Sequence, residues 1–77
     1  MTLKELIERL DKEKIPKNSY SLEGGLPNDR ICLAKTPTGW EVYYSEMGQK
    51  YEVKTYKLEE EACDDLYNRL KRMMRLM

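Results

Sequence analysis

The residues that could do chemistry in this chain are carboxylates, lysines, tyrosines and two cysteines, because the sequence contains no histidine. Histidine is the usual general base and the usual activator of a serine or cysteine nucleophile. No two carboxylates stand at a spacing typical of an acid–base pair on facing strands. The segment GGLPND contains two glycines but lacks the spacing of the phosphate-binding glycine motifs. We therefore expect no catalytic residue and no cofactor.

The two cysteines, Cys32 and Cys63, are far apart in the sequence and lie in apolar-patterned segments. A structural zinc site needs four ligands, mostly thiolates and imidazoles, so we expect no metal. The charged N-terminal segment has no signal-peptide pattern, which favours a cytoplasmic protein with reduced thiols. Both side chains are then small buried hydrophobes. A disulfide would require Cα atoms about 4.4–6.8 Å apart, which the sequence leaves open.

The aromatic residues point to binding rather than catalysis, since the chain has six tyrosines, one tryptophan and no phenylalanine. Tyrosine and tryptophan combine an apolar body with a polar tip, which suits protein interfaces. Tyrosine also fills half-buried strand positions, so a single tyrosine says little. The pair Tyr43-Tyr44 says more, because neighbouring strand residues point to opposite faces and one of the two must point away from the core.

The N-terminal segment that must position these residues reads as an amphipathic helix over residues 2–14. Thr2 and Glu5 have the spacing of a capping box. Pro16 ends the helical pattern. Residues 16–29 are rich in proline, glycine and asparagine and predict a loop. The apolar positions recur at three- and four-residue spacing, at Leu3, Leu6, Ile7 and Leu10.

After residue 30 the pattern changes to a period near two, which predicts strands over residues 31–35, 40–46 and 51–56. Short turns join them, so the strands form an antiparallel meander. Residues 58–76 return to helical spacing. Acidic residues gather at the start of that helix and basic residues at its end, as the helix macrodipole favours.

The predicted fold class is therefore α+β in the order αβββα: a three-stranded antiparallel meander with the N- and C-terminal helices packed on one face. In the strand over 40–46, Trp40, Val42 and Tyr44 share one face, and Glu41, Tyr43 and Ser45 share the other. The first set is apolar, so we expect the helices to cover it. The second set is then left to solvent or to a partner.

Length and charge limit the function classes. A chain of 77 residues is one small domain, residues 1–77. Lysine and arginine balance the acidic residues to a net charge of zero, which argues against a nucleic-acid partner. No apolar run approaches the roughly 20 residues of a membrane span, so we expect no membrane partner.

Three ordered segments resemble a bacterial family. They are YSLEGGLPND (residues 20–29), WEVYYSEMG (residues 40–48) and EEEAC (residues 59–63). Together they are similar to small immunity proteins of polymorphic or contact-dependent toxin systems. The resemblance covers about residues 20–70. It implies a cytoplasmic, non-enzymatic protein that neutralises a cognate toxin by stoichiometric binding.

Two other functions stay open. The chain could be a small structural or regulatory subunit that forms a homodimer through the same sheet face or edge. It could also be a phage or mobile-element inhibitor of a host protein. Self-association without a toxin would favour the first of these over an immunity protein.

We place the predicted partner-binding surface on one loop and on one face of the central strand. The loop glycines would let a partner's backbone approach closely. Tyr43 would supply a rigid anchor, and Glu46 at the strand end would pair with a basic group of the partner. The predicted site residues are Glu23, Gly24, Gly25, Tyr43, Ser45 and Glu46.

Overall fold

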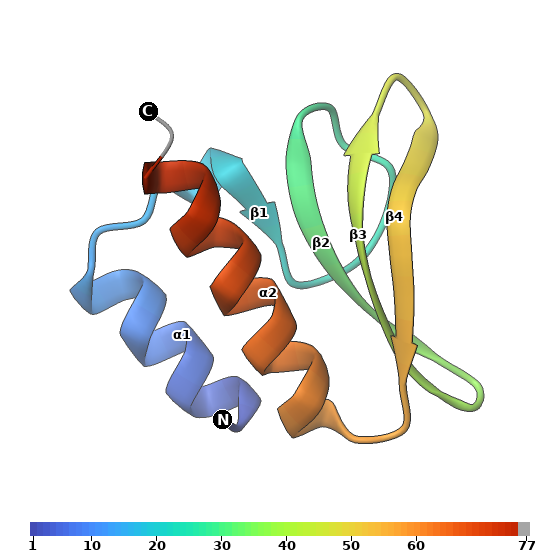
Figure 1. Ribbon diagram of the computed structural model, residues 1–77, viewed down its shortest axis with the longest axis horizontal. Helices are drawn as coiled ribbons and strands as arrows, with labels where there is room; N and C mark the ends of the chain where they lie inside the picture. Colours follow the sequence, from blue (N-terminus) through green and yellow to red (C-terminus); the bar gives the residue numbers. More distant parts are fainter. Residues whose placement is uncertain (76–77) are drawn as a thin grey trace.

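The computed structural model describes residues 1–75, and it has the predicted α+β fold with a helix at each end of a sheet (Figure 1). The elements follow each other as α1 (Leu3–Lys12), the short 3-10 helix η1 (Lys17–Ser19), β1 (Tyr20–Ser21), β2 (Arg30–Thr36), β3 (Gly39–Glu46), β4 (Gln49–Tyr56) and α2 (Glu59–Arg75). No helix within residues 1–75 is both long and apolar enough to cross a membrane.

The sheet has four strands in the order β1-β2-β3-β4, where the sequence predicted three. The additional strand β1 pairs with β2 in parallel, with Tyr20 opposite Ile31 and Ser21 opposite Cys32. The prediction of a loop throughout residues 16–29 was therefore wrong, and the sheet is mixed rather than purely antiparallel. Two residues are too few to show an alternating pattern, and the prolines and glycines around them are typical of a loop. The other pairs are antiparallel, as predicted.

The helix ends depend on local hydrogen bonds. The capping box at Thr2 is confirmed: the Thr2 hydroxyl accepts from the Glu5 amide, and the Glu5 carboxylate accepts from the Thr2 amide. Helix α1 ends at Lys12, two residues earlier than predicted, because Lys14 has a φ of 55° and leaves the helical region. Helix α2 begins at Glu59, and residue 76, the predicted end, lies outside the described residues.

Both helices lie on one side of the sheet, as predicted (Figure 1). Helix α2 packs across β2 and β3, and α1 packs beside α2. The hydrophobic core lies between the two helices and the sheet. Each fully buried leucine there contributes about 1.5–3 kcal/mol to the stability of the fold. Trp40 is half-buried at its margin rather than fully buried as expected. The buried core residues are Leu6, Leu10, Ile15, Ile31, Leu33, Val42, Ala62, Cys63, Leu66 and Leu70.

The other face of the sheet carries Glu41, Tyr43 and Ser45, which point away from the helices as predicted. The expectation that this face is left to solvent or to a partner was wrong for Tyr43 and Ser45, which are 1% and 0% exposed. The chain between β1 and β2, residues 22–29, folds back over this face. We call it the covering loop. Its contacts position the candidate site.

Strand β4 is the edge of the sheet away from β1 and is almost entirely exposed. Its pairing with β3 is interrupted by a register shift between Val42 and Tyr44. Glu52 lies at this irregularity with a φ of 52°. A bulge of this kind increases the local twist of an edge strand.

Candidate binding groove

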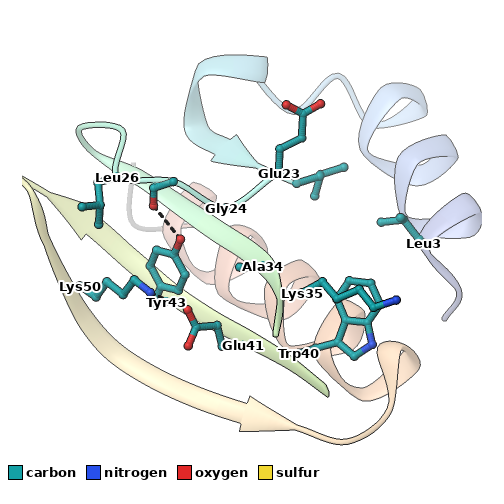
Figure 2. Close-up of a pocket in the computed structure, with 12 residues that line it drawn as sticks. Leu3, Glu23, Gly24, Leu26, Ala34, Lys35, Trp40, Glu41, Tyr43 and Lys50 are labelled. Atoms are coloured by element: carbon teal, nitrogen blue, oxygen red, sulfur yellow. Dashed lines mark hydrogen bonds and ion pairs between the residues drawn. The ribbon is translucent and has the colours of Figure 1, made fainter. Parts of the chain in front are cut away.

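A groove of about 710 Å³ runs between the covering loop and the β2–β3 hairpin (Figure 2). It contains four of the six predicted site residues, namely Glu23, Gly24, Gly25 and Tyr43. The structure therefore brings the predicted loop and the predicted strand together, as the sequence analysis expected. The other residues that line the groove are Leu3, Leu22, Leu26, Ala34, Lys35, Trp40, Glu41 and Lys50.

Gly24 fixes the covering loop onto the sheet. Its amide donates to the Leu33 carbonyl at 2.9 Å, which continues the pairing that β1 begins. Its φ is 69°, and a Cβ added there would lie 3.0 Å from the Ala34 Cβ. Glycine is required by this backbone conformation and this close contact together. The backbone that approaches closely is thus the chain's own β2. Gly24 is buried and does not offer its backbone to a partner, contrary to the prediction.

Tyr43 forms a hydrogen bond to Gly25, the residue of the covering loop that follows Gly24. Its hydroxyl donates to the Gly25 carbonyl at 2.6 Å, as the dashed line in Figure 2 shows. The Lys50 ammonium lies 4.5 Å from the centre of the tyrosine ring and 2.6 Å from a Glu41 carboxylate oxygen. Burial, with the nearby Cys32 and Glu41, raises the pKa of Tyr43 to about 12. The predicted role of Tyr43 as an exposed anchor is wrong, because the ring is covered and its hydroxyl is used internally.

Ser45 and Glu46 lie outside the groove. Ser45 is fully buried and its hydroxyl has no hydrogen-bond partner. The Asn28 side chain accepts a hydrogen bond from the Met47 amide at 3.0 Å, so the end of the covering loop is fastened beside this end of β3. Ser45 therefore cannot contact a partner directly, contrary to the prediction. Glu46 is half-buried at the end of the strand.

Several groove residues were missed by sequence reasoning, which expected the helices to cover Trp40 and assigned no site role to Leu26. Leu26 is 51% exposed, and Trp40 is half-buried with the Lys35 ammonium 5.6 Å from its ring centre. One signal in the sequence could have predicted the contact between Lys35 and Trp40. A tight turn over residues 36–39 places residue 35 opposite residue 40, which is the observed pairing of Lys35 with Trp40. No comparable signal exists for Leu26, whose exposure depends on the path of the loop.

The prediction that the two cysteines are buried is confirmed, and neither of them forms a disulfide. Burial raises the pKa of Cys63 to about 11 and also raises that of Cys32. Both are therefore protonated and poorly nucleophilic at neutral pH. Among residues 1–75, no three cysteine, aspartate or glutamate side chains lie close enough to hold a metal ion.

Comparison with protein-family models, with curated proteins and with solved structures finds no significant match to this chain. The resemblance to immunity proteins therefore rests on the three sequence segments. In the structure, the first of them contains β1 and the covering loop, the second forms β3 and the following turn, and the third begins α2.

Proposed function

We propose that this chain is a non-enzymatic, protein-binding inhibitor, and specifically an immunity protein that neutralises a cognate bacterial toxin by stoichiometric binding. The observation that carries the proposal is the groove between the covering loop and the β2–β3 hairpin. It combines exposed apolar surface with charges of both signs on a frame held by backbone hydrogen bonds. Such a toxin-binding role would place the protein in the cytoplasm.

The chemistry of the groove describes the partner segment that would bind there. Leu26 and Trp40 offer apolar and aromatic surface, which favours an apolar side chain on the partner. Glu23 and Lys35 are exposed at the rim. Rim charges of this kind set orientation and partner choice more than affinity. A partner with one apolar anchor flanked by groups of both charges would fit this groove.

A second function, self-association as a small structural or regulatory subunit, is favoured by a different observation. The exposed edge strand β4 carries Tyr51 at 43% and Val53 at 44% exposure, and a second copy could pair along it. The irregularity at Glu52 and the lysines on this strand work against such pairing. We therefore rank self-association below toxin binding.

Co-expression with the neighbouring toxin domain tests the proposed function. The gene beside this one would encode a secreted protein with a variable C-terminal domain. The chain should restore growth to cells that express that domain, and the two should form a one-to-one complex by calorimetry. A domain that stays toxic and binds nothing would contradict the proposal. A monodisperse dimer of this chain without a partner would favour self-association.

Two matched substitutions locate the binding surface once a partner is in hand. Leu26→Glu introduces a charge into the groove, and Leu58→Glu does the same at a residue of similar exposure outside it. We expect Leu26→Glu to cost at least about 2 kcal/mol of binding, about thirtyfold in affinity. Leu58→Glu should bind within twofold of wild type. Equal binding by both variants would place the interface elsewhere.

A further inference from the structure

A second surface lies on the helix side of the sheet, where α2 passes β4. Two adjoining hollows of about 400 and 280 Å³ open there and share Glu52, Arg69 and Arg72. We call them together the α2–β4 hollow. Their remaining lining residues are Ile31, Tyr44, Val53, Lys54 and Asp65.

Arg69 forms the base of the α2–β4 hollow and is only 7% exposed. Its Nε donates to Asp65 Oδ1 at 2.9 Å and its Nη2 donates to Asp65 Oδ2 at 3.2 Å. The Tyr56 hydroxyl donates to the same Asp65 oxygen, Oδ2, at 2.6 Å. Asp65 therefore holds the guanidinium group in one orientation.

The other terminal nitrogen of Arg69, Nη1, is buried and has no hydrogen-bond partner. Leaving a buried donor without an acceptor is unfavourable, and the great majority of such groups in folded proteins are satisfied. The surrounding side chains add positive charge. Arg72 and Lys54 line the same hollow, and neither forms an ion pair within residues 1–75. A buried, oriented arginine with an unused donor beneath two further cations is an arrangement that suits an oxyanion.

We propose that the α2–β4 hollow binds a carboxylate, namely an aspartate or glutamate side chain of a protein partner. Two acidic groups, Asp65 and Glu52, line it with the cations. They favour a singly charged carboxylate over a doubly charged phosphate. The balanced charge of the whole chain also gives no attraction for a nucleic-acid backbone. This inference rests on the hollow alone and does not depend on the groove or on the identity of a toxin.

The rim of the hollow sets how the ligand reaches Arg69. Nη1 lies below the surface, whereas Glu52 and Arg72 are exposed side chains at the rim. Glu52 is itself a carboxylate that lines the hollow, so it competes with an incoming carboxylate for the same cations. Removing the charge of Glu52 should therefore strengthen binding, while removing the charge of Arg72 should weaken it.

Titration of the ¹⁵N-labelled full chain tests the proposal. The probe is the tripeptide acetyl-Gly-Glu-Gly-amide, compared with acetyl-Gly-Gln-Gly-amide and with inorganic phosphate at constant ionic strength. We expect a saturable shift of the Arg69 Nε–H signal at millimolar glutamate peptide and none with the glutamine peptide. A non-saturating response, an equal response to both peptides, or tighter binding of phosphate would overturn the proposal.

Three single variants sharpen the assignment. Arg72→Gln should weaken glutamate-peptide binding at least fivefold, and Glu52→Gln should strengthen it at least twofold. Arg75→Gln removes a charge from an exposed arginine one turn further along α2 that does not line the hollow. It should bind within twofold of wild type. If Arg72→Gln and Arg75→Gln behave alike, the response is general electrostatic attraction and the site is refuted.

Discussion

Both faces of the sheet carry buried side chains at β2 and β3, but these are buried by different means. The face toward the helices is covered by apolar side chains from α1 and α2, such as Leu10 and Leu66. The other face is covered by the loop between β1 and β2, which is held by single hydrogen bonds from the Gly24 amide and the Tyr43 hydroxyl. The helices are held on their face by buried apolar area, whereas the covering loop is held on the other face by a few hydrogen bonds.

This difference bears on where the molecule can open. Burial of apolar area is spread over many contacts, so the helix-covered face should be lost only on global unfolding. A loop held by few hydrogen bonds belongs to the part of a protein that opens locally at lower free energy. The covering loop lines one side of the candidate groove. We therefore expect the binding surface to be the more adjustable face.

The largest expected effect is on the helix-covered face. Leu66 is fully buried in α2 against the sheet, and Leu66→Ala should destabilise the protein by about 2–5 kcal/mol through lost burial and a residual cavity. Urea unfolding followed by circular dichroism measures this. Leu58→Ala, at a residue 59% exposed, is the control and should change stability by less than about 0.5 kcal/mol. Similar curves for the two variants would mean that Leu66 is not in the core.

The next effect tests how closely the loop packs on its face. Gly24 and Gly48 both have positive φ, 69° and 76°, so alanine is strained at either position. This strain costs about 1–2 kcal/mol. Only at Gly24 would the new Cβ also meet a neighbour, Ala34 at 3.0 Å, because nothing lies within 4 Å at Gly48. Gly24→Ala should therefore be the more destabilising variant in the same urea assay.

A double variant separates the contact from the strain. Ala34→Gly in the Gly24→Ala background removes the atom that the new Cβ meets. It should recover part of the lost stability relative to the sum of the single changes, which a double-mutant cycle measures. Equal losses at Gly24 and Gly48, with no coupling to Ala34, would show that the loop does not press on β2.

A smaller effect belongs to the hydrogen bond that closes the loop. Tyr43→Phe keeps the buried ring and removes the hydroxyl that donates to Gly25, so it should cost about 0.5–1.5 kcal/mol. Hydrogen exchange of the amides in residues 22–28 should speed up in this variant more than exchange in α2. The control is Tyr51→Phe, whose hydroxyl bonds only to the exposed Gln49 side chain. Unchanged loop exchange in Tyr43→Phe would remove the distinction between the two covers.

The fold was largely predictable because its signals are local and repeated. The alternation in residues 40–46 correctly assigned Val42 to the helix side and Tyr43 to the other side. The spacing of Leu66 and Leu70 correctly identified the buried side of α2. Each of these assignments depends on several residues that agree with one period.

The cover over the second face was not predictable, and for the same reason the site was only partly predictable. A strand pattern gives the direction of a side chain, but not what lies above it. Tyr43 and Ser45 are polar enough to be exposed, and their burial depends on contacts with a loop distant in sequence. The two-residue strand β1 and the path of residues 22–29 depend on individual hydrogen bonds. Such bonds produce no periodic pattern of apolar residues in the sequence.

The last prediction concerns alkaline pH and compares one tyrosine from each face. Tyr43 lies on the face that the covering loop buries, where its hydroxyl donates to the Gly25 carbonyl. Tyr56 lies beside α2, where its hydroxyl donates to Asp65. For each, burial is the main cause that raises the pKa from 10.0 to about 12, and a hydrogen bond to the Asp65 carboxylate adds to it at Tyr56. Both therefore stay protonated in the folded protein at a pH where the unfolded chain has lost the proton.

Stability should fall between about pH 10 and pH 12, because over that interval the unfolded state binds fewer protons than the folded state. Below pH 10 these two groups should add no pH dependence. Tyr43→Phe and Tyr56→Phe should each make the fall shallower when urea midpoints are measured across this range. If the covering loop opens on its own, folded Tyr43 ionises through that opening, and Tyr43→Phe will flatten the curve less than Tyr56→Phe. Equal flattening by the two variants would show that both faces become exposed only on global unfolding.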